Sequence, residues 1–220
     1  MLDPQPGSTP NAGPVVLASA SPRRSELLRA LIDEFDVLPS DVPEPLSGDP
    51  RQDAVQLAIA KARAVAAERP HALVIGADTI VYEGTNLYGK PADAAHAVAM
   101  WTALRGREHV VVTGIALLAG NETSSDWSES HITLSNLTDA EVAAYVASGR
   151  PMDKAGAYAI QDEDIPTVAA RGGCYCSTMG LPLWRLGRML AVRGIACREP
   201  HASLPRCAIC PERDAGQSRR

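Results

Sequence analysis

The sequence predicts an α/β protein built around a mixed β-sheet. Short apolar runs of strand length alternate with longer stretches whose apolar residues recur at helical spacing, which is typical of a sheet flanked by helices. Two strand-like runs, at 110–118 and 130–134, follow one another with no helix between them, so part of the sheet should pair antiparallel. With 45% hydrophobic residues over 220 positions, the chain can bury an ordinary globular core.

The earlier strands are marked by their apolar content. Residues 15–18 form a short apolar run, and 35–39 form a second one that ends in a proline. Residues 73–82 form a longer apolar run, which is typical of a buried central strand.

Helix boundaries are marked by proline and by capping residues. Ser21 suits an N-cap and Pro22 suits the first helical position, so a helix should begin there. Thr138 and Glu141 have the spacing of a capping box, in which each side chain binds the other residue's backbone N–H. Further helices are expected at 51–69, 93–104, 138–148 and 181–194.

Composition divides the chain into three parts. Residues 1–13 are rich in Pro and Gly, lack the apolar stretch of a signal peptide, and are expected to be flexible. Residues 14–196 should form one domain, and the polar segment 197–220 is expected to be a mobile tail. No apolar run approaches the ~20 residues that cross a membrane, and five scattered cysteines do not resemble a disulfide framework. We therefore expect a cytoplasmic protein.

The overall charge limits the possible partners. A net charge of −5 argues against a general nucleic-acid binder, which would carry a basic face. An acidic protein that binds phosphates must gather its cations locally or recruit a divalent metal ion.

Two arginines stand where a helix normally disfavours them. Arg23 and Arg24 fall in the first turn after Pro22, beside the positive end of the helix dipole, at a cost of roughly 0.3–1 kcal/mol each. A bound anion would explain them, because free backbone N–H groups and two guanidinium groups form a phosphate clamp. The alternative is a solvated helix start with two surface arginines.

Asp78 is the one carboxylate within the apolar run 73–81. Burial there raises a carboxylate pKa unless a cation compensates, and proteins keep such groups when they are paired, metal-bound or catalytic. The alternative is an aspartate at a strand end that caps a neighbouring loop. Gly76, two residues earlier, allows a backbone or a ligand to come close.

Three lysines lie in helical or junction segments, namely Lys61, Lys90 and Lys154. Each could be an ordinary exposed lysine, Lys61 most readily. Gly89 and Pro91 hold the backbone on either side of Lys90. The chain contains no P-loop, no dinucleotide-binding glycine fingerprint, no HExxH spacing and no recognisable Ser/His/Asp motif.

Taken in order, these segments resemble the Maf family of nucleoside triphosphate pyrophosphatases. The resemblance runs from about residue 15 to about residue 192 and includes Lys61-Ala62 and the strand around Val112-Thr113-Gly114. Its other motifs are SASPRRSELL at 19–28, GADTIV at 76–81, GKP at 89–91, SGRPMDKAGAYAIQ at 148–161 and GLPL at 180–183.

The resemblance implies a Maf/inosine-triphosphatase-like fold, with an elongated mixed sheet flanked by helices and two lobes around a deep cleft. It implies hydrolysis of a nucleoside triphosphate, with dTTP and UTP as the substrates of this branch, to the monophosphate and pyrophosphate, with Mg²⁺ or Mn²⁺ and in a homodimer. Asp78 matches the general base, and Asp78 with Glu44 would bind the metal. The matching substrate-binding or specificity positions are Ser19, Arg23, Arg24, Lys61, Thr79, Lys90, Asp153, Lys154 and Gln161.

The chain departs from the family pattern at two places. Arg150 stands where the family often has Glu before Pro, so the local charge is reversed. Residues 173–180 replace a segment that usually carries Asn near Ser177. Either change could shift the base preference or lower the activity without touching the phosphate chemistry.

Two alternatives for the function and one for the tail stay open. The chain could be a nucleotide-binding regulator of cell division that does not hydrolyse its ligand, although binding alone needs no proton acceptor. It could also prefer modified pyrimidine nucleotides. In the tail, Cys197, His201, Cys207 and Cys210 have a spacing that could hold zinc, but the surrounding sequence lacks the packed context of a zinc module.

Overall fold

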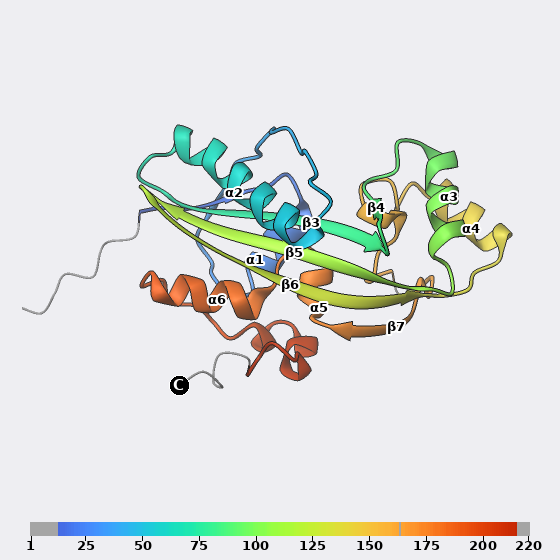
Figure 1. The fold of residues 1–220 in the computed structure, drawn as a ribbon. Coiled ribbons are helices and arrows are strands. Elements are labelled where there is room, and N and C mark those ends of the chain that lie inside the picture. The colour runs from blue at the N-terminus through green and yellow to red at the C-terminus, as the bar shows by residue number, and fades with distance from the viewer. Residues whose placement is uncertain (1–12, 163, 215–220) are drawn as a thin grey trace, which may run out of the picture.

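The computed structural model describes residues 13–162 and 164–214, and Figure 1 shows their arrangement. The strands are β1 (Val15–Ala18), β2 (Asp36–Val37), β3 (Leu73–Glu83), β4 (Asn86–Tyr88), β5 (Glu108–Ala119), β6 (Glu122–Leu134) and β7 (Val168–Gly173). The α-helices are α1 (Pro22–Leu28), α2 (Pro50–Glu68), α3 (Ala94–Leu104), α4 (Asp139–Ala147), α5 (Tyr175–Thr178) and α6 (Leu183–Val192). Short 3₁₀ helices are η1 (Ala155–Ala157), η2 (Pro200–Ala202) and η3 (Pro205–Ile209).

The strands form one mixed sheet, as the sequence predicts. Its order is β2-β1-β3-β5-β6-β7, and β4 pairs with the far end of β3. β1 runs parallel to both β2 and β3, whereas the remaining pairs are antiparallel. The long β3, β5 and β6 strands make the sheet elongated (Figure 1).

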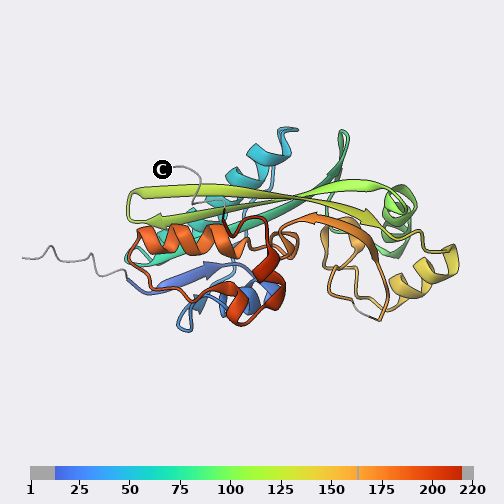
Figure 2. The same cartoon turned by 90° about the horizontal axis from the view of Figure 1, so that it is seen from below.

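Helices cover both faces of the β1 end of the sheet, α2 on one face and α1 with α6 on the other (Figures 1 and 2). Neighbouring residues of one strand point to opposite faces. Val74 of β3 therefore packs in the cluster under α2, while Ile75 packs in the cluster with α1 and α6. Together these layers form the first lobe.

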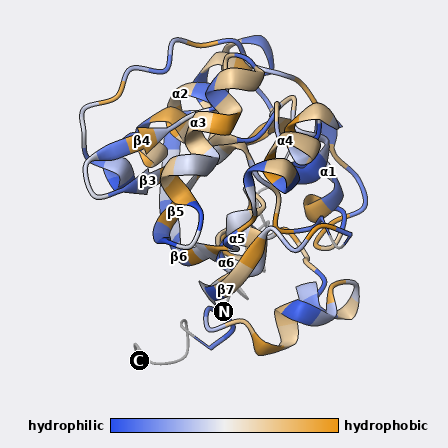
Figure 3. Ribbon diagram, turned by 90° about the vertical axis from the view of Figure 1, so that its right-hand side faces the viewer, coloured by the Kyte–Doolittle hydropathy of each residue, from blue (hydrophilic) through white to orange (hydrophobic). Residues whose placement is uncertain are grey.

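A second lobe lies at the other end of the sheet, where Figure 3 looks onto α3 and α4. Its core joins α3, α4 and the segment around η1. The rings of Trp101 and Tyr145 meet edge to face with centroids 5.7 Å apart, and Trp101 Nε1 donates to the Ala157 carbonyl at 2.8 Å. The second lobe thus has a hydrophobic cluster separate from those of the first lobe, which agrees with the expected pair of lobes.

Local signals placed most helix boundaries correctly. Pro22 begins α1, although the Ser21 side chain makes no capping hydrogen bond. Asp93 caps α3, and Thr138 with Glu141 forms the predicted capping box of α4.

Strand predictions were incomplete in the second half of the sheet. β6 begins at Glu122 rather than at residue 130, and β7 was not predicted. The first half of β6 is polar, so it carries little strand signal of its own. It is held by a continuous antiparallel ladder with β5, a pairing that no local pattern reveals.

The C-terminal segment differs from the mobile tail that the sequence predicted. Up to residue 214 it packs on the first lobe, with Cys207 and Cys210 in its hydrophobic core. Trp184 Nε1 donates to the Cys207 carbonyl at 3.0 Å, and Arg185 forms a 2.6 Å ion pair with Glu212. The burial of its apolar side chains explains why this segment packs on the lobe. Residues 1–12 of the expected flexible segment and 215–220 of the tail lie outside the described residues.

The four tail residues considered for zinc are not brought together. Cys197 contacts the Ile195 carbonyl at 3.7 Å, and the His201 ring stacks on Trp184 with centroids 6.0 Å apart. The structure therefore does not support this quartet, which the sequence had left open, because the fold turns Cys207 and Cys210 toward a different part of the chain. Among the described helices, none has both the length and the apolar character needed to cross a bilayer.

Candidate active site

A cavity of about 690 Å³ lies between the two lobes, a volume suited to a nucleotide-sized ligand. It opens along β3 where that strand has a partner on one side only. β1 pairs with β3 up to Gly76, and β4 pairs from Val81 onward. Residues 77–80 therefore pair only with β5. Ser19, Arg23, Arg24, Glu44, Lys61, Asp78, Thr79, Lys90, Asp153, Lys154 and Gln161 all line the cavity.

Close packing of α2 on the sheet brings Lys61 to Asp78. A Cβ on Gly76 would lie 2.0 Å from the Ala58 carbonyl oxygen, and one on Gly114 would lie 2.3 Å from that of Ala54. Only glycine permits this approach. The glycine at 76 was expected to allow a close contact, and the contact is with the backbone of α2.

Asp78, Lys61 and Glu44 form the charged centre of the cavity. Lys61 Nζ lies 2.5 Å from Asp78 Oδ1 and 2.6 Å from Glu44 Oε1. Asp78 is 7% exposed, whereas the Glu44 side chain is 55% exposed. Burial raises the pKa of Asp78, and the charges of Lys61 and Arg24 oppose that rise. A buried carboxylate of this kind is a suitable proton acceptor.

Arg24 belongs to a second network of polar side chains that lines the cavity. Its Nε donates to the Gly180 carbonyl at 2.9 Å, and its NH2 donates to Thr79 Oγ1 at 3.1 Å. Thr79 Oγ1 also lies 2.9 Å from Thr113 Oγ1, which donates to the Ser177 carbonyl at 2.7 Å. Desolvation lowers the pKa of Arg24, while the charge of Asp78 raises it.

Arg23 connects the first lobe to the second. Its NH1 lies 2.7 Å from Asp153 Oδ2, and Lys154 Nζ lies 2.6 Å from Asp153 Oδ1. Asp153 is more than half exposed, whereas Lys154 is mostly buried. A ligand phosphate reaching this place would compete with Asp153 for both cations.

Three more predicted residues line the cavity, namely Ser19, Lys90 and Gln161. Ser19 is buried at the end of β1, where its hydroxyl accepts from the Ser21 N–H at 3.2 Å and from Arg24 at 3.4 Å. Lys90 is an exposed lining residue, and Gln161 is a half-buried one.

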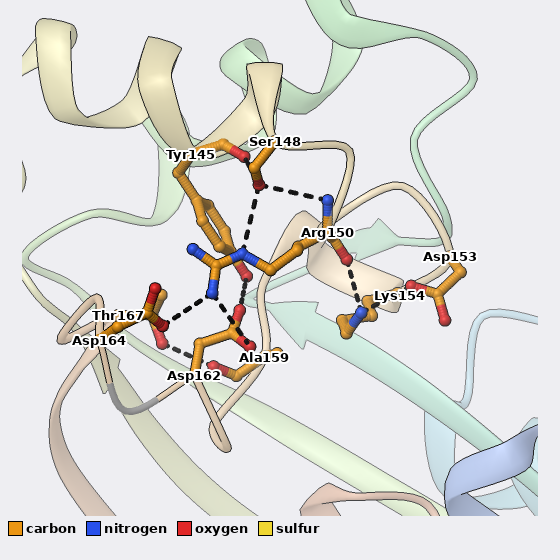
Figure 4. Close-up of polar contacts among 9 residues, drawn as sticks. All are labelled: Tyr145, Ser148, Arg150, Asp153, Lys154, Ala159, Asp162, Asp164 and Thr167. Atoms are coloured by element: carbon orange, nitrogen blue, oxygen red, sulfur yellow. Dashed lines mark hydrogen bonds and ion pairs between the residues drawn. The ribbon is translucent and has the colours of Figure 1, made fainter.

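Arg150, the charge-reversed position, is not among the residues that line the cavity, and its guanidinium points toward Asp162 and Asp164 (Figure 4). Its NH1 lies 2.7 Å from Asp164 and 4.0 Å from Asp162, and its guanidinium stacks 5.6 Å from the Tyr145 ring. Its backbone carbonyl accepts from Lys154 Nζ at 2.5 Å. Arg150 therefore contacts the predicted site through its backbone carbonyl, which binds Lys154.

Sequence reasoning missed several groups that shape the site. Thr113 was noted only as part of a strand motif, and Tyr158, which also lines the cavity, was noted only within a longer motif. Thr113 lies next to Thr79 in space but 34 residues from it along the chain, and a hydroxyl in a strand carries no functional signal of its own.

The donor set at the centre of the cavity suits a divalent metal ion that also binds substrate. Asp78 and Glu44 would supply two oxygen ligands, and because the single charge of Lys61 lies against both carboxylates, the three groups keep one net negative charge. Among the described residues, the one group of three closely spaced metal-binding side chains is elsewhere. Mg²⁺ is typically held by one or two carboxylates together with substrate phosphates and water, so these two residues fit such an ion.

Residues 14–193 match the family described as Maf-like protein. A dTTP/UTP pyrophosphatase of Koribacter versatilis is 45% identical over 82% of this chain and 95% of that protein. One of Thermomicrobium roseum is 42% identical over 90% of this chain and 93% of that protein. Among solved structures, the Staphylococcus aureus Ham1 protein overlaps 56% of this chain and 72% of its own at 17% identity, with a TM-score of 0.40. The family match and the two close relatives show that the chain belongs to the Maf family.

Proposed function

We propose that this protein hydrolyses dTTP and UTP to the nucleoside monophosphate and pyrophosphate. The observation that carries the proposal is Asp78, a buried carboxylate whose pKa is raised and which faces a cavity rich in cations. Relatives above 40% identity are named dTTP/UTP pyrophosphatases.

In the proposed mechanism Asp78 accepts a proton from the attacking water. General-base catalysis of this kind typically contributes about 10²–10⁴-fold. The cations around the cavity hold the polyphosphate and offset the charge that develops on the departing pyrophosphate. They are Arg23, Arg24, Lys61, Lys90 and Lys154.

A divalent ion would be held by Asp78 and Glu44. When bound, Mg²⁺ or Mn²⁺ supplies positive charge that neutralises phosphate oxygens. Lys61 lies against both carboxylates, so it limits their mutual repulsion and holds them together.

Base selection falls to Arg23, Thr79 and Gln161. Gln161 carries an amide that can both donate and accept a hydrogen bond, as recognition of a uracil or thymine edge requires. Thr79 is already bonded to Arg24 and Thr113, which holds its hydroxyl in one orientation. A site built on hydrogen bonds rejects mismatched bases strongly. Modified pyrimidine nucleotides remain within the proposed substrate range.

The test is pyrophosphate release from a panel of nucleoside triphosphates in the presence of Mg²⁺ or Mn²⁺. We expect turnover to be fastest with dTTP and UTP or their 5-substituted forms, and to stop when the metal is chelated. Asp78→Asn should lower kcat by about 10²–10⁴-fold. Asp139→Asn is the matched control, because Asp139 is an exposed carboxylate paired with Arg105 on the other lobe.

Equal turnover by Asp78→Asn and the parent would refute the role of Asp78. Tight dTTP binding without any monophosphate formed would instead favour the non-hydrolysing regulator of cell division. A homodimer in the cytoplasm is part of the same proposal, and sedimentation equilibrium would test the dimer directly.

A further inference from the structure

Four of the five cysteines gather in one buried place beneath the sheet. Cys174 and Cys176 stand at the start of α5, while Cys207 and Cys210 come from the C-terminal segment around η3. Their exposed fractions are 1%, 0%, 1% and 8% in chain order. The two pairs come from segments that are distant in sequence, and Cys207 and Cys210 lie beyond the family match.

The sulfur atoms form a continuous cluster. Cys176 Sγ lies 3.1 Å from Cys207 Sγ. Cys174 Sγ, Cys210 Sγ and a carboxylate oxygen of Glu212 all lie within 4.8 Å of one another. Cys174 joins the two pairs, because it lies beside Cys210 in space and two residues before Cys176 along the chain, although Cys176 and Cys207 fall outside that group of three.

The surroundings of the cluster favour a bound cation over four neutral thiols. The Ser177 backbone N–H donates to Cys174 Sγ at 3.4 Å, the kind of bond that stabilises a thiolate. Glu212 is 7% exposed, and while its Oε1 pairs with Arg185, its Oε2 completes no hydrogen bond to any described residue. The Ser128 hydroxyl is a neighbour of this carboxylate but is likewise unsatisfied. The unpaired carboxylate oxygen beside the cluster points to a group that the described residues do not supply.

We propose that Cys174, Cys176, Cys207 and Cys210 bind one structural zinc ion that clamps the C-terminal segment to the first lobe. Four cysteines in two close pairs are a standard ligand set for zinc, and Zn–S bonds of about 2.3 Å in tetrahedral geometry place sulfurs about 3.8 Å apart. The observed 3.1 Å separation is nearer to this than to the ~2.05 Å bond of a disulfide. With four protein ligands the ion has no open position for substrate, so its role is structural. Binding releases the thiol protons to solvent.

The charge of such a centre is offset locally. Four thiolates and one Zn²⁺ leave two negative charges, to which Glu212 adds another. Arg171 and Arg206 both stack on the ring of Tyr175, at 4.8 and 4.7 Å, between the first two ligands. Arg185 pairs with Glu212 itself.

The zinc site would also fix the position of α5 and of the turn after it, which contact residues of the active-site cavity. Its first two ligands begin α5, whose Ser177 carbonyl binds Thr113 and whose following turn supplies the Gly180 carbonyl to Arg24. This inference does not depend on the proposed function, because the metal content of the protein can be measured without any substrate.

The test is the zinc content of untagged full-length protein, expressed in zinc-supplemented medium and purified under reducing conditions. Mass spectrometry of the metal should find about one zinc per chain. The matched control is Cys197→Ser, which removes the cysteine outside the cluster and should keep the zinc. Cys176→Ser and Cys210→Ser should each lose most of it.

A second measurement keeps the test decisive if those variants do not fold. Titrating the parent's thiols with an organomercurial should release the zinc in step with the four cluster cysteines, as followed with a colorimetric chelator. Cobalt substitution should give the absorption of a tetrahedral thiolate site. Five free thiols with no zinc, a mass lowered by disulfide formation despite added zinc, or zinc retained equally by both cluster variants would each overturn the proposal.

Discussion

The buried position of Asp78 disfavours its negative charge. It sits in a strand that is apolar on both sides along the chain, and burial is the largest influence on its pKa. Lys61 and Arg24 compensate only in part, so the carboxylate keeps a raised pKa. A buried carboxylate with a raised pKa is typical of catalytic groups.

The raised pKa of Asp78 predicts two pH dependences. Because the carboxylate must be ionised to accept a proton, kcat/KM should rise with pH through an apparent pKa above the ordinary 3.8. The folded state also keeps the proton to higher pH than the unfolded chain, so the stability from this group is present at low pH and is lost as pH rises through the folded pKa.

Asp78→Asn does not titrate, so its melting temperature relative to the parent should be higher at pH 7 than at pH 4. Differential scanning calorimetry at the two pH values measures this difference. A constant offset would mean that the pKa of Asp78 is not raised.

Lys154 and Arg150 are neighbours with different expected roles. Lys154 lines the cavity, whereas the Arg150 guanidinium faces Asp164 and Asp162 (Figure 4). Loss of a charged hydrogen bond to phosphate should raise KM for dTTP by about 10- to 100-fold in Lys154→Ala. Arg150→Ala should change KM by less than about threefold, because exposed ion pairs contribute little. Steady-state kinetics of both variants would contradict this assignment if their KM values changed alike.

At the scale of elements, the position of α2 decides the chemistry. The helix rests on the backbones of β3 and β5 at Gly76 and Gly114, and this contact sets Lys61 against Asp78. The neighbouring edge of β3 is open because β1 has ended and β4 has not begun. The cavity therefore depends both on where β1 and β4 end along β3 and on how closely α2 packs on the sheet.

Gly76→Ala should test the depth of that packing. The new methyl group would lie 2.0 Å from the Ala58 carbonyl oxygen, so α2 must move outward, at a cost of about 1–3 kcal/mol in the free energy of unfolding. Activity should fall too, because Lys61 moves with the helix. Gly172→Ala is the control, since its Cβ would meet only the His131 Cβ at 3.9 Å. Urea denaturation measures the free energy of unfolding of both variants. Equal values would contradict the prediction, because α2 would then move outward without loss of stability.

At the scale of the whole molecule, His109 links the sheet to the second lobe. Its Nε2 lies 2.7 Å from the Tyr158 hydroxyl, and its ring meets that of Tyr158 edge to face. Burial lowers the pKa of His109 to about 4. Tyr158 also lines the cavity, so this contact joins the sheet, the second lobe and the site.

His109 should make the folded protein sensitive to acid. Its lowered pKa stabilises the fold above the unfolded value of 6.5, and that stability is lost as the pH falls toward about 4. The free energy of unfolding should drop with a slope of up to about 1.4 kcal/mol per pH unit in this window. His109→Gln should show a shallower slope, while the exposed control His71→Gln should match the parent. Parallel slopes in all three proteins would contradict the prediction.

Much of this organisation is readable from local sequence. The capping box of Thr138 and Glu141, the proline at the start of α1 and the apolar run of β3 act over a few residues, so their structures were predicted correctly. Asp78 was recognisable as a candidate because one carboxylate in an apolar run conflicts with burial wherever the strand lies.

Other features depend on contacts between distant segments. The polar half of β6 becomes a strand only by pairing with β5, and the tail is ordered only by packing on α6 and the sheet. Lys61 reaches Asp78 because glycine lets α2 approach, and Cys174 meets Cys210 because the chain returns beneath the sheet. Propensity and spacing describe neighbours along the chain, whereas these contacts are selected by the burial and pairing of the complete fold.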